Sequence, residues 1–450
     1  MYKLHFILKQ HSPLIHFQHD QEGATLRATE VKPKLDKFMI EQFGEKIKKN
    51  WYNNVDHGSL NYKLRILPPK RRSQFFIFST NENNEIIGQI KSHYPKNGII
   101  SGTQYFADNN LLKKKNSTRM NDNGKPIKEF DFEKSKLNNA KLGLFYTKIE
   151  CQIICFDESL KECIKKCLAS FFVFNNFGNR QSKGFGCFTI EKIDNELNNL
   201  PFDDELKKAK KDISVFKTSL TADNMITIIE DSSKAYKILK SGMNTQSFKN
   251  PVYVKSLLFI YFCEKEKIRW EKRWIKQKAK LAGKLSYFKG KAKSIDCDCN
   301  KALEVPTGNN YKYVRGVLGI AETNEFLKEM GSEKFIVEIK NASIDRYQSP
   351  ILIKINNKQI YFICKNNFDL VKDKPFNFKL FTDSRKPTNL ESDLKLLNTP
   401  SKFNLKEFMN WCNTYMQSVS KADARNEKCK DDLRNYLFEI EDLNPDSNEQ

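Results

Sequence analysis

The chain has 450 residues, of which 39% are hydrophobic and 34 are phenylalanine, enough apolar material for the cores of two or three domains. Lysine and arginine total 77 against 55 aspartate and glutamate residues, which leaves a formal net charge of +22. These values exclude a wholly disordered chain, and no stretch approaches the roughly 20 apolar residues that a membrane-spanning helix needs. We expect a globular protein without membrane contact. Because its first residues lack the pattern of a secretion signal, we also expect it to be cytoplasmic.

The positive charge favours a polyanionic partner, because neutralising phosphates releases condensed counterions. The alternative is that the abundant Lys, Asn and Ile residues reflect an AT-rich genome, and that the protein is a cytosolic scaffold whose charge has no ligand. RNA binding that weakens as salt rises would separate these two interpretations.

The first half of the chain alternates strands and helices. Helices are expected from near Glu30, with Pro33 in the first turn, and after Asp157 as the N-cap. The expected strands cover 2–15, 60–67, 73–80, 85–94, 142–154 and 185–190. Residues 95–142 are rich in Asn, Lys and Gly and are expected to form a mobile insertion. This order is close to that of a ferredoxin-like, split βαβ domain over residues 1–200.

The second unit, residues 201–450, is expected to repeat this fold with helical insertions. Its expected strands are 212–220, 334–341 and the hairpin 351–366, which turns at Asn356–Asn357; its expected helices are 222–242, one long basic helix over 253–282, and the region 402–441. The acidic end from residue 439 is expected to fray. The predicted fold class is therefore α+β, with two ferredoxin-like (RRM-like) domains and a helical C-terminal part.

The long basic segment carries Trp270 and Trp274 four residues apart. One interpretation is a solvated helix face with two tryptophans anchored in the core. The other is a basic groove with aromatic stacking partners for RNA.

The stretch "FGNRQSKGFGCF" (177–188) places three glycines around two cations. Glycine accepts positive φ and lets another backbone approach closely, and exposed N–H groups in such a turn can form an anion-binding nest. Phe177 or Phe185 could stack on a base. The spacing is not that of a P-loop, and a plain glycine turn is the alternative. Our candidate RNA-binding residues in this stretch are Gly178, Asn179, Arg180, Gln181, Lys183, Gly184, Phe185 and Gly186.

Three more stretches complete a pattern. "GATLRATEVKPKL" (23–35) follows the first strand, and "RGVLGIAE" (315–322) precedes "RYQSPILIKI" (346–355). Together with the glycine-rich stretch, they resemble motifs of the RAMP superfamily, the repeat-associated proteins of CRISPR effector complexes. Their order is most similar to that in the first-numbered subunit of the Cmr (type III-B) complex.

The resemblance implies a non-catalytic RNA-binding subunit of a type III-B CRISPR effector complex, acting in antiviral defence. Such a subunit binds guide RNA near its 3′ end, touches target RNA and contacts other subunits of the complex. Carried over by position, the further RNA-binding candidates are Arg27, Lys32, Lys34, Arg315 and Arg346. Ser349 matches as well, although Arg346 and Ser349 could instead be structural residues around Pro350. No cofactor is implied.

An enzyme remains the alternative, because RAMP relatives that mature guide RNA cut it by metal-independent acid–base chemistry. All six histidines lie in the first 93 residues: His5, His11, His16, His19, His57 and His93. Of these, His16 and His19 are the best candidates for an endoribonuclease. For each histidine, a hydrogen-bonded structural role is the simpler interpretation.

Metal sites have weaker signals. His16, His19 and Asp20 could hold a metal, and Asp20 with Glu22 could form a nuclease pair, but short acidic loops are common. Four cysteines (Cys151, Cys155, Cys163 and Cys167) lack the CxxC knuckle of a zinc site. Cys163 and Cys167 also lie on the apolar stripe of a helix, so we expect no metal site there.

Overall fold

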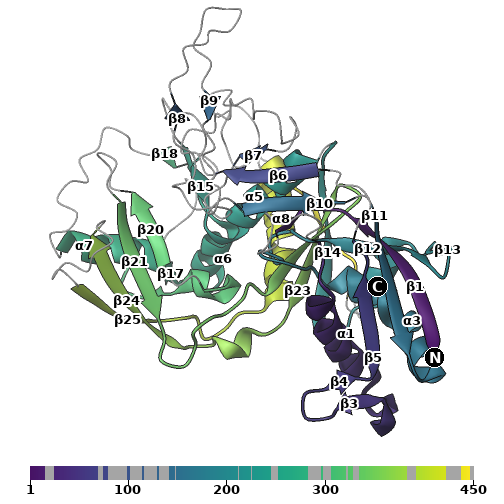
Figure 1. The fold of residues 1–450 in the computed structure, drawn as a ribbon. Helices are drawn as coiled ribbons and strands as arrows, with labels where there is room; N and C mark the ends of the chain where they lie inside the picture. The colour runs from purple at the N-terminus through teal and green to yellow at the C-terminus, as the bar shows by residue number, and fades with distance from the viewer. Residues whose placement is uncertain are drawn as a thin grey trace, which may run out of the picture.

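The structure is a computed structural model. It describes residues 1–15, 25–68, 74–79, 99–101, 114–115, 129–130, 141–146, 148–210, 212–223, 225–244, 252–281, 295–296, 306–320, 323–327, 334–382, 392–421 and 437–445. Figure 1 shows a mixed chain of helices and several sheets, as expected for the α+β class. In the described part, no helix is long and apolar enough to cross a lipid bilayer.

The first sheet has the strand order β13-β12-β1-β11-β5, with every neighbouring pair antiparallel. Its strands are β1 (Tyr2–Gln10), β5 (Tyr62–Ile66), β11 (Lys148–Cys155), β12 (Phe188–Ile193) and β13 (Glu196–Leu197). Alternate residues of β1, including Leu4, Phe6 and Leu8, are buried on one face of this sheet.

Helices α1 (Ala28–Phe43) and α3 (Glu158–Phe174) cover that buried face. The N-cap of α3 is confirmed, because the Asp157 carboxylate accepts a hydrogen bond from the Leu160 amide at 2.9 Å. Helix α1 begins at Ala28, earlier than expected, which moves Pro33 from the first into the second turn. The expected strand over 142–154 is two strands, β10 (Lys141–Phe145) and β11.

The second sheet has the order β22-β23-β14-β26, again antiparallel throughout. It consists of β14 (Ile213–Thr221), β22 (Ile351–Asn356), β23 (Gln359–Lys365) and β26 (Ile440–Asp442). The β22–β23 turn is one residue later than expected, at Asn357 and Lys358, whose φ values of 45° and 68° fit a tight hairpin. Fraying of the whole acidic end was a wrong expectation, since β26 pairs with β14.

Helices α5 (Met225–Lys240), α6 (Leu257–Lys265) and α8 (Leu405–Lys421) contribute to the large core of the second half. The expected long helix over 253–282 is wrong. The segment forms β16 (Val252–Val254), α6, β17 (Arg269–Trp270) and α7 (Glu271–Leu281). Ser256 caps the start of α6, and Lys267 at φ 51° turns the chain away after its end.

A third sheet is built from the segments between the elements of the second, in the order β20-β21-β24-β25. Its strands are β20 (Thr323–Leu327), β21 (Lys334–Lys340), β24 (Pro375–Thr382) and β25 (Ser392–Asn398). A fourth has the order β2-β10-β6-β7, with β2 (Leu14–Ile15), β6 (Gln74–Ser79) and β7 (Ile99–Ser101).

The remaining strands form small sheets. They are β3 (Tyr52–Asn54), β4 (Ser59–Leu60), β8 (Lys114–Lys115), β9 (Glu129–Phe130), β15 (Met243–Asn244), β18 (Ile295–Asp296) and β19 (Tyr311–Lys312). Short 3₁₀ turns cover Gly44–Lys46, Lys49–Trp51, Val314–Leu318 and Phe368–Leu370. The expected strand 85–94 and most of the expected mobile insertion 95–142 lie outside the described residues.

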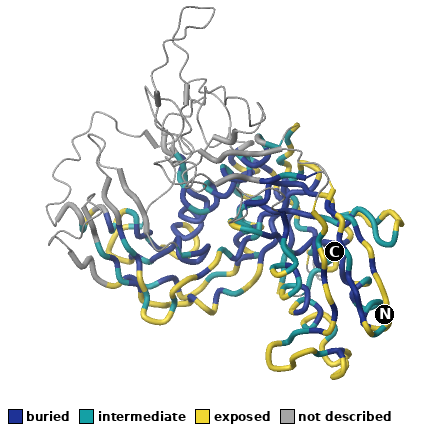
Figure 2. Tube along the Cα trace, in the orientation of Figure 1, coloured by how far each residue is buried: buried dark blue, intermediate teal, exposed yellow. Residues whose placement is uncertain are grey.

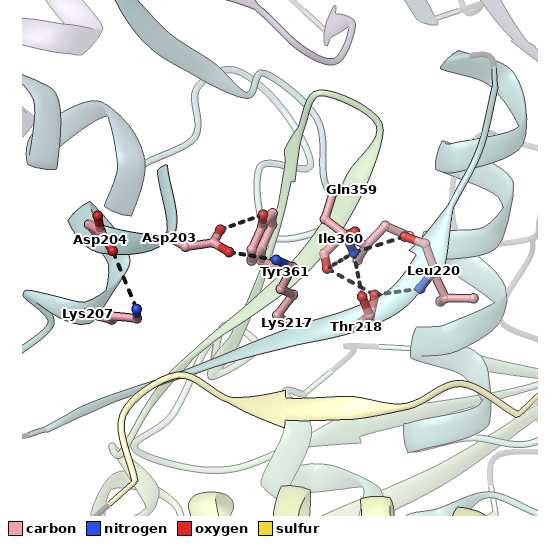
Figure 3. A network of polar contacts seen from close by, with 9 residues as sticks. All are labelled: Asp203, Asp204, Lys207, Lys217, Thr218, Leu220, Gln359, Ile360 and Tyr361. Carbon is pink, nitrogen blue, oxygen red and sulfur yellow. Dashed lines mark hydrogen bonds and ion pairs between the residues drawn. The ribbon is translucent and has the colours of Figure 1, made fainter. Parts of the chain in front are cut away.

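Helix α4 (Phe202–Lys207) connects the two large sheets. Asp203 accepts hydrogen bonds from the Lys217 ammonium at 2.6 Å and the Tyr361 hydroxyl at 2.7 Å, which fastens α4 to β14 and β23 (Figure 3). Glu205 accepts a hydrogen bond from Ser170 on α3 at 2.5 Å. The connector is therefore bonded to both halves of the chain.

Candidate nucleic-acid interface

The glycine-rich segment, residues 177–188, lies where the two large sheets meet. Its Ser182 carbonyl accepts a hydrogen bond from the Ile353 amide of β22 at 3.2 Å. On the other side, the Asn179 amide donates to the Ile15 carbonyl at 2.8 Å. The segment thus touches elements from both ends of the chain.

Close packing explains its three glycines. Gly178, Gly184 and Gly186 have φ values of 78°, 83° and 64°, which favour glycine. A Cβ atom on Gly186 would lie 1.9 Å from the Phe177 carbonyl oxygen, and one on Gly178 would lie 2.8 Å from the Ile15 carbonyl oxygen. A side chain at either position would collide with backbone.

The anion-nest interpretation does not fit the hydrogen bonding. The amide of Gly178 donates to the Glu30 carboxylate at 2.8 Å, and the amide of Gly186 donates to the Pro13 carbonyl at 2.9 Å. The Lys183 amide donates to the Arg180 carbonyl at 2.8 Å. Gly178 and Gly186 therefore serve chain packing, and their amide donors already have partners within the protein.

Helix α1 is bonded to this segment through two charged side chains, Lys34 and Glu30. The Lys34 ammonium donates to the Gln181 side-chain oxygen at 2.7 Å and to the Asn176 carbonyl at 3.0 Å. It also lies 4.8 Å from the centroid of the Phe177 ring. Glu30 completes the link, because its Oε1 accepts from both Lys34 and Gly178.

The second half of the chain is bonded to the same segment through Tyr236 of α5. The Lys183 ammonium lies 3.0 Å from the centroid of the Tyr236 ring. The Tyr236 hydroxyl contacts the Leu318 carbonyl at 2.8 Å and the Ser349 hydroxyl at 3.1 Å. Burial, with the nearby charge of Lys240, lowers the pKa of Lys183 well below its ordinary value.

All four motif stretches seen in the sequence therefore meet in one place, which we call the motif junction. It comprises residues 27–34, 177–188, 315–319 and 346–350. Lys240 strengthens it by donating to the carbonyls of Leu318 and Gly319 at 3.0 and 2.6 Å. Sequence positions more than 300 residues apart thus form one structural unit.

Two further contacts lock the halves together beside this junction. Lys354 of β22 is fully buried, and its ammonium donates to the carbonyls of Phe172, Asn175 and Phe188 in the first half, at 2.5, 3.0 and 3.1 Å. Two of these carbonyls belong to the C-terminal end of α3, where a cation is favoured. Burial lowers the pKa of Lys354 from 10.5 to about 8.

His11 forms the second lock. Its Nδ1 accepts a hydrogen bond from the Asn357 amide at 3.2 Å, so Nε2 carries the proton and donates to the Thr189 hydroxyl at 2.7 Å. Burial, helped by the charges of Lys354 and Lys9, lowers the pKa of His11 to about 3. This histidine is a neutral structural residue.

Several candidate RNA contacts make their contacts within the protein, and some of them are buried. Phe177 and Phe185 are fully buried, so the expectation that either stacks on a base is wrong. Arg315 is buried in an ion pair with Glu271 of α7, which also accepts from the Val314 amide at 3.0 Å. Lys32 donates to Asp36 at 2.7 Å and to the Leu60 carbonyl at 2.9 Å, which fixes α1 against β4.

Other candidates lie at the edge of the motif junction. Arg346 and Asn179 are exposed, while Arg27 and Arg180 are half-buried. Arg27 is the N-cap residue of α1, and Arg180 has a φ of 58°. These four residues, which we call the junction rim, can present polar groups to a ligand. Ser349 is structural, since it bonds Tyr236 and the Ile351 backbone.

Three residues that hold the junction together escaped the sequence reasoning: Glu30, Tyr236 and Lys354. Two had a readable signal. Glu30 precedes Lys34 by one helical turn, and Lys354 is a single charge inside the apolar strand "ILIKI". Tyr236 had none, because a tyrosine on an amphipathic helix is ordinary.

The structure shows the surroundings of the two tryptophans of the basic segment. Trp270 is buried with its ring 4.6 Å from Phe259, and Trp274 packs at 5.6 Å against Phe378 of the third sheet. Both tryptophans are core anchors.

Only some of the candidate catalytic and metal-binding residues lie in the described part of the chain. His16, His19, Asp20, Glu22 and His93 lie outside the described residues. His5 and His57 are exposed, and His5 contacts the Gln152 amide at 3.2 Å. In the described part, no group of three His, Cys, Asp or Glu side chains could hold a metal ion.

The four cysteines of the first half belong to its core. Cys151, Cys155 and Cys167 are buried and Cys163 packs at the edge of the same apolar cluster. Burial raises the pKa of the Cys167 thiol to about 12, so it remains protonated at neutral pH. This agrees with the expectation of ordinary helix core around Cys163 and Cys167.

Comparisons with known proteins cover nearly the whole chain. A family model described as the Cmr1 N-terminal domain matches residues 1–243, and one described as the Cmr1 C-terminal domain matches residues 253–435. No curated protein matches the sequence significantly.

Solved structures are similar at low identity. One chain from the cryo-EM structure of the Type III-B Cmr-beta bound to cognate target RNA is 11% identical, with a TM-score of 0.25. That match covers 42% of this chain and spans 59% of the other. A chain from the Cmr-beta structure with cognate target RNA and AMPPnP, in the presence of ssDNA, is also 11% identical, with a TM-score of 0.32. That match covers 86% of this chain and 96% of the other.

Proposed function

The chain belongs to the Cmr1 family of the type III-B CRISPR effector complex, and from this premise we propose that it is a non-catalytic RNA-binding subunit of that complex. It binds guide RNA near its 3′ end, touches target RNA and contacts other subunits. It acts in the cytoplasm, in antiviral defence. The net charge of +22 supports an RNA partner, because most nucleic-acid affinity comes from phosphate neutralisation.

The observation that carries this proposal is the motif junction. Four stretches chosen for their resemblance to one family converge through direct contacts, with Tyr236 contacting Lys183, Leu318 and Ser349. A plain glycine turn would need no such convergence. In this proposal the buried members hold the shape of the junction, and the RNA meets its rim.

The rim residues are therefore the proposed RNA contacts of the junction: Arg27, Asn179, Arg180 and Arg346. Arginine can donate two parallel hydrogen bonds to a phosphate, and an exposed Asn amide adds a neutral donor. Four other candidates hold this surface in place through their contacts within the protein: Lys32, Lys34, Lys183 and Arg315.

We also propose that both halves are ferredoxin-like and that the chain divides near residue 200. The strand orders support this assignment. When the four main strands of the first sheet are numbered by their order in the chain, they lie side by side in the order 4-1-3-2 (β12, β1, β11, β5). The strands of the second sheet lie in the same order (β26, β14, β23, β22). A split βαβ fold has this arrangement.

The absence of catalysis is part of the proposal. Among the described histidines, His11 is the most deeply buried, and it is a neutral, hydrogen-bonded structural residue. The alternative is a metal-independent endoribonuclease that uses His16. Cleavage of repeat RNA that persists in EDTA and is lost in His16→Ala would replace our proposal with this one.

The decisive experiment is a pull-down of the tagged chain from its native cell, followed by sequencing of the bound RNA. The rim variant is Arg27→Ala/Arg180→Ala/Arg346→Ala, and the charge-matched control is Lys37→Ala/Lys265→Ala/Lys372→Ala, which changes exposed lysines elsewhere. We expect short repeat-derived guide RNAs with the wild type and control, and their loss with the rim variant. Heterogeneous RNA, or none, from the wild type would refute the proposed function.

A further inference from the structure

The first sheet has one face that the helices do not cover. Helices α1 and α3 pack on the side chains of Leu4, Phe6 and Leu8. The intervening residues of β1, Lys3, His5 and Lys9, are exposed. Figure 2 shows exposed chain beside the N-terminus, where β1 lies. The pairing register shows which residues of the neighbouring strands lie on this open face.

The register brings cations from three strands onto the open face. Lys3 pairs with Ile154, which pairs with Lys63 of β5, so these three residues form one row. The next row is His5, Gln152 and Arg65. Lys9 lies directly opposite Lys148. Residues directly opposite in a sheet share a face, with neighbouring strands about 4.8 Å apart.

We call this set the cationic sheet face: Lys3, Lys9, Lys63, Arg65 and Lys148, all exposed. Glu150 is the exposed acid among the described residues of the same face. Like charges directly opposite in a sheet are unfavourable, as at Lys9 and Lys148. Each has a local partner, since Lys9 donates to Asn357 at 3.0 Å and Lys148 lies 3.4 Å from Glu191.

Lys3, Lys63 and Arg65 differ from that pair. These three residues lie within two adjacent rows of the sheet. In the described part of the chain, none of them has an ion-pair partner. Along a strand, residues on one face repeat about every 7 Å. The three charges therefore form a flat cationic patch over β1, β11 and β5, which lie side by side in Figure 1.

We propose that the cationic sheet face binds the backbone of single-stranded RNA, with Lys3, Lys63 and Arg65 as its main phosphate contacts. Charge complementarity selects a polyanion. The face presents long, flexible cations and no described exposed aromatic ring at its centre, so it neutralises phosphates without reading bases. This inference rests on the proposed function and adds a second RNA surface, separate from the junction rim.

The test measures binding of the full chain to fluorescein-labelled oligouridylate by anisotropy across a range of KCl concentrations. The variant is Lys3→Gln/Lys63→Gln/Arg65→Gln. Its control, Lys37→Gln/Lys265→Gln/Lys372→Gln, removes the same charge from exposed positions elsewhere. For single strands the slope of log K against log salt changes by about 0.7 for each phosphate contact, so we expect the slope to flatten by about 2 in the sheet variant. The control should retain nearly the full slope, and oligoadenylate should give the same pattern.

Each other outcome overturns the inference. If the wild type binds and both triple variants have equal slopes, only the sheet proposal fails. If the sheet variant keeps its RNA slope but no longer co-purifies with the other effector subunits, the face is a protein interface. If the wild type does not bind RNA, the proposed function fails as well. Lys3→Arg/Lys63→Arg keeps the charge and should bind like the wild type, which separates charge loss from misfolding.

Discussion

At the scale of single residues, the glycine-rich segment illustrates how one pattern serves packing and function together. Gly186 has a φ of 64° and would place a Cβ 1.9 Å from the Phe177 carbonyl oxygen. The two cations of this segment lie in different surroundings. Lys183 lies over the Tyr236 ring, whereas Arg180 lies at the junction rim. The glycines bring the chain close enough for these contacts.

Gly186→Ala should therefore destabilise the protein strongly. The left-handed conformation costs an alanine about 1–2 kcal/mol, and the collision with backbone raises the loss to about 3 kcal/mol or more. Gly44→Ala is the matched control, since Gly44 also has a positive φ of 52° but nothing within 4 Å of the added Cβ. Urea denaturation of both variants measures the difference. Equal losses would mean that the close approach at Gly186 does not matter.

At the scale of elements, local breaks override strong periodic patterns. The segment 253–282 has helical composition, yet Lys267 adopts φ 51° and α6 ends at Lys265. The break allows Trp270 to turn back onto Phe259 and Trp274 to reach Phe378. The break therefore brings both tryptophans into aromatic contacts.

Lys267→Gly tests this break. Glycine removes about 1–2 kcal/mol of left-handed strain but costs about 0.5–1 kcal/mol of chain entropy, so we expect a net gain of about 0.5–1 kcal/mol in the free energy of unfolding. Lys265→Gly, inside the last turn of α6, should instead lose about 0.5–1 kcal/mol. Chemical denaturation of the two variants gives opposite signs if the helix breaks here. Losses in both would indicate a continuous helix.

The contact between β22 and the end of α3 predicts a pH effect. The pKa of Lys354 is lowered to about 8 from 10.5 by burial. A base with a lower pKa in the folded protein binds fewer protons there than in the unfolded chain. Its contribution to stability therefore rises as pH increases from about 8 toward 10.5.

Lys354→Met should abolish that part of the rise. The measurement is the difference in unfolding free energy between wild type and variant at several pH values above 7, compared with the exposed control Lys37→Met. The unfolding free energy of the wild type should increase relative to that of Lys354→Met as pH rises from about 8 toward 10.5. A difference that stays constant with pH would show that Lys354 is not perturbed.

At the scale of the whole molecule, the two large sheets are joined as one unit. Lys354, His11 and Tyr236 each bond groups from distant parts of the chain. Helix α4 bonds β23 through Asp203 (Figure 3) and bonds α3 through Glu205. Breaking either half would leave buried polar groups of the other half without partners, which costs free energy.

We therefore expect the halves to unfold together. Trp51 reports on the first core, and Trp270 and Trp411 report on the second. In Trp51→Phe, the fluorescence transition in urea should coincide with the far-ultraviolet circular dichroism transition of the whole chain. A fluorescence midpoint that differs clearly from the dichroism midpoint would show that the halves unfold independently.

The order of helices and strands could be predicted because it depends on local signals. Asp157 caps α3 as its side chain predicts, and β14 and α5 lie where the apolar periodicity placed them. The errors fell where local and distant interactions compete. Strand β26 was missed because a short polar strand is stabilised only by its partner β14.

The sequence by itself determined the α+β class, the basic charge and the set of motif stretches, because composition, periodicity and residue order are local properties. It also led to the family through those stretches. Only the tertiary structure decided which motif residues face inward. Arg315, Lys183 and Phe185 look like ligand contacts in a linear pattern, yet burial and pairing across hundreds of residues give them structural roles. Burial depends on which distant segments pack together, and this is why the rim and the cationic sheet face emerge only in three dimensions.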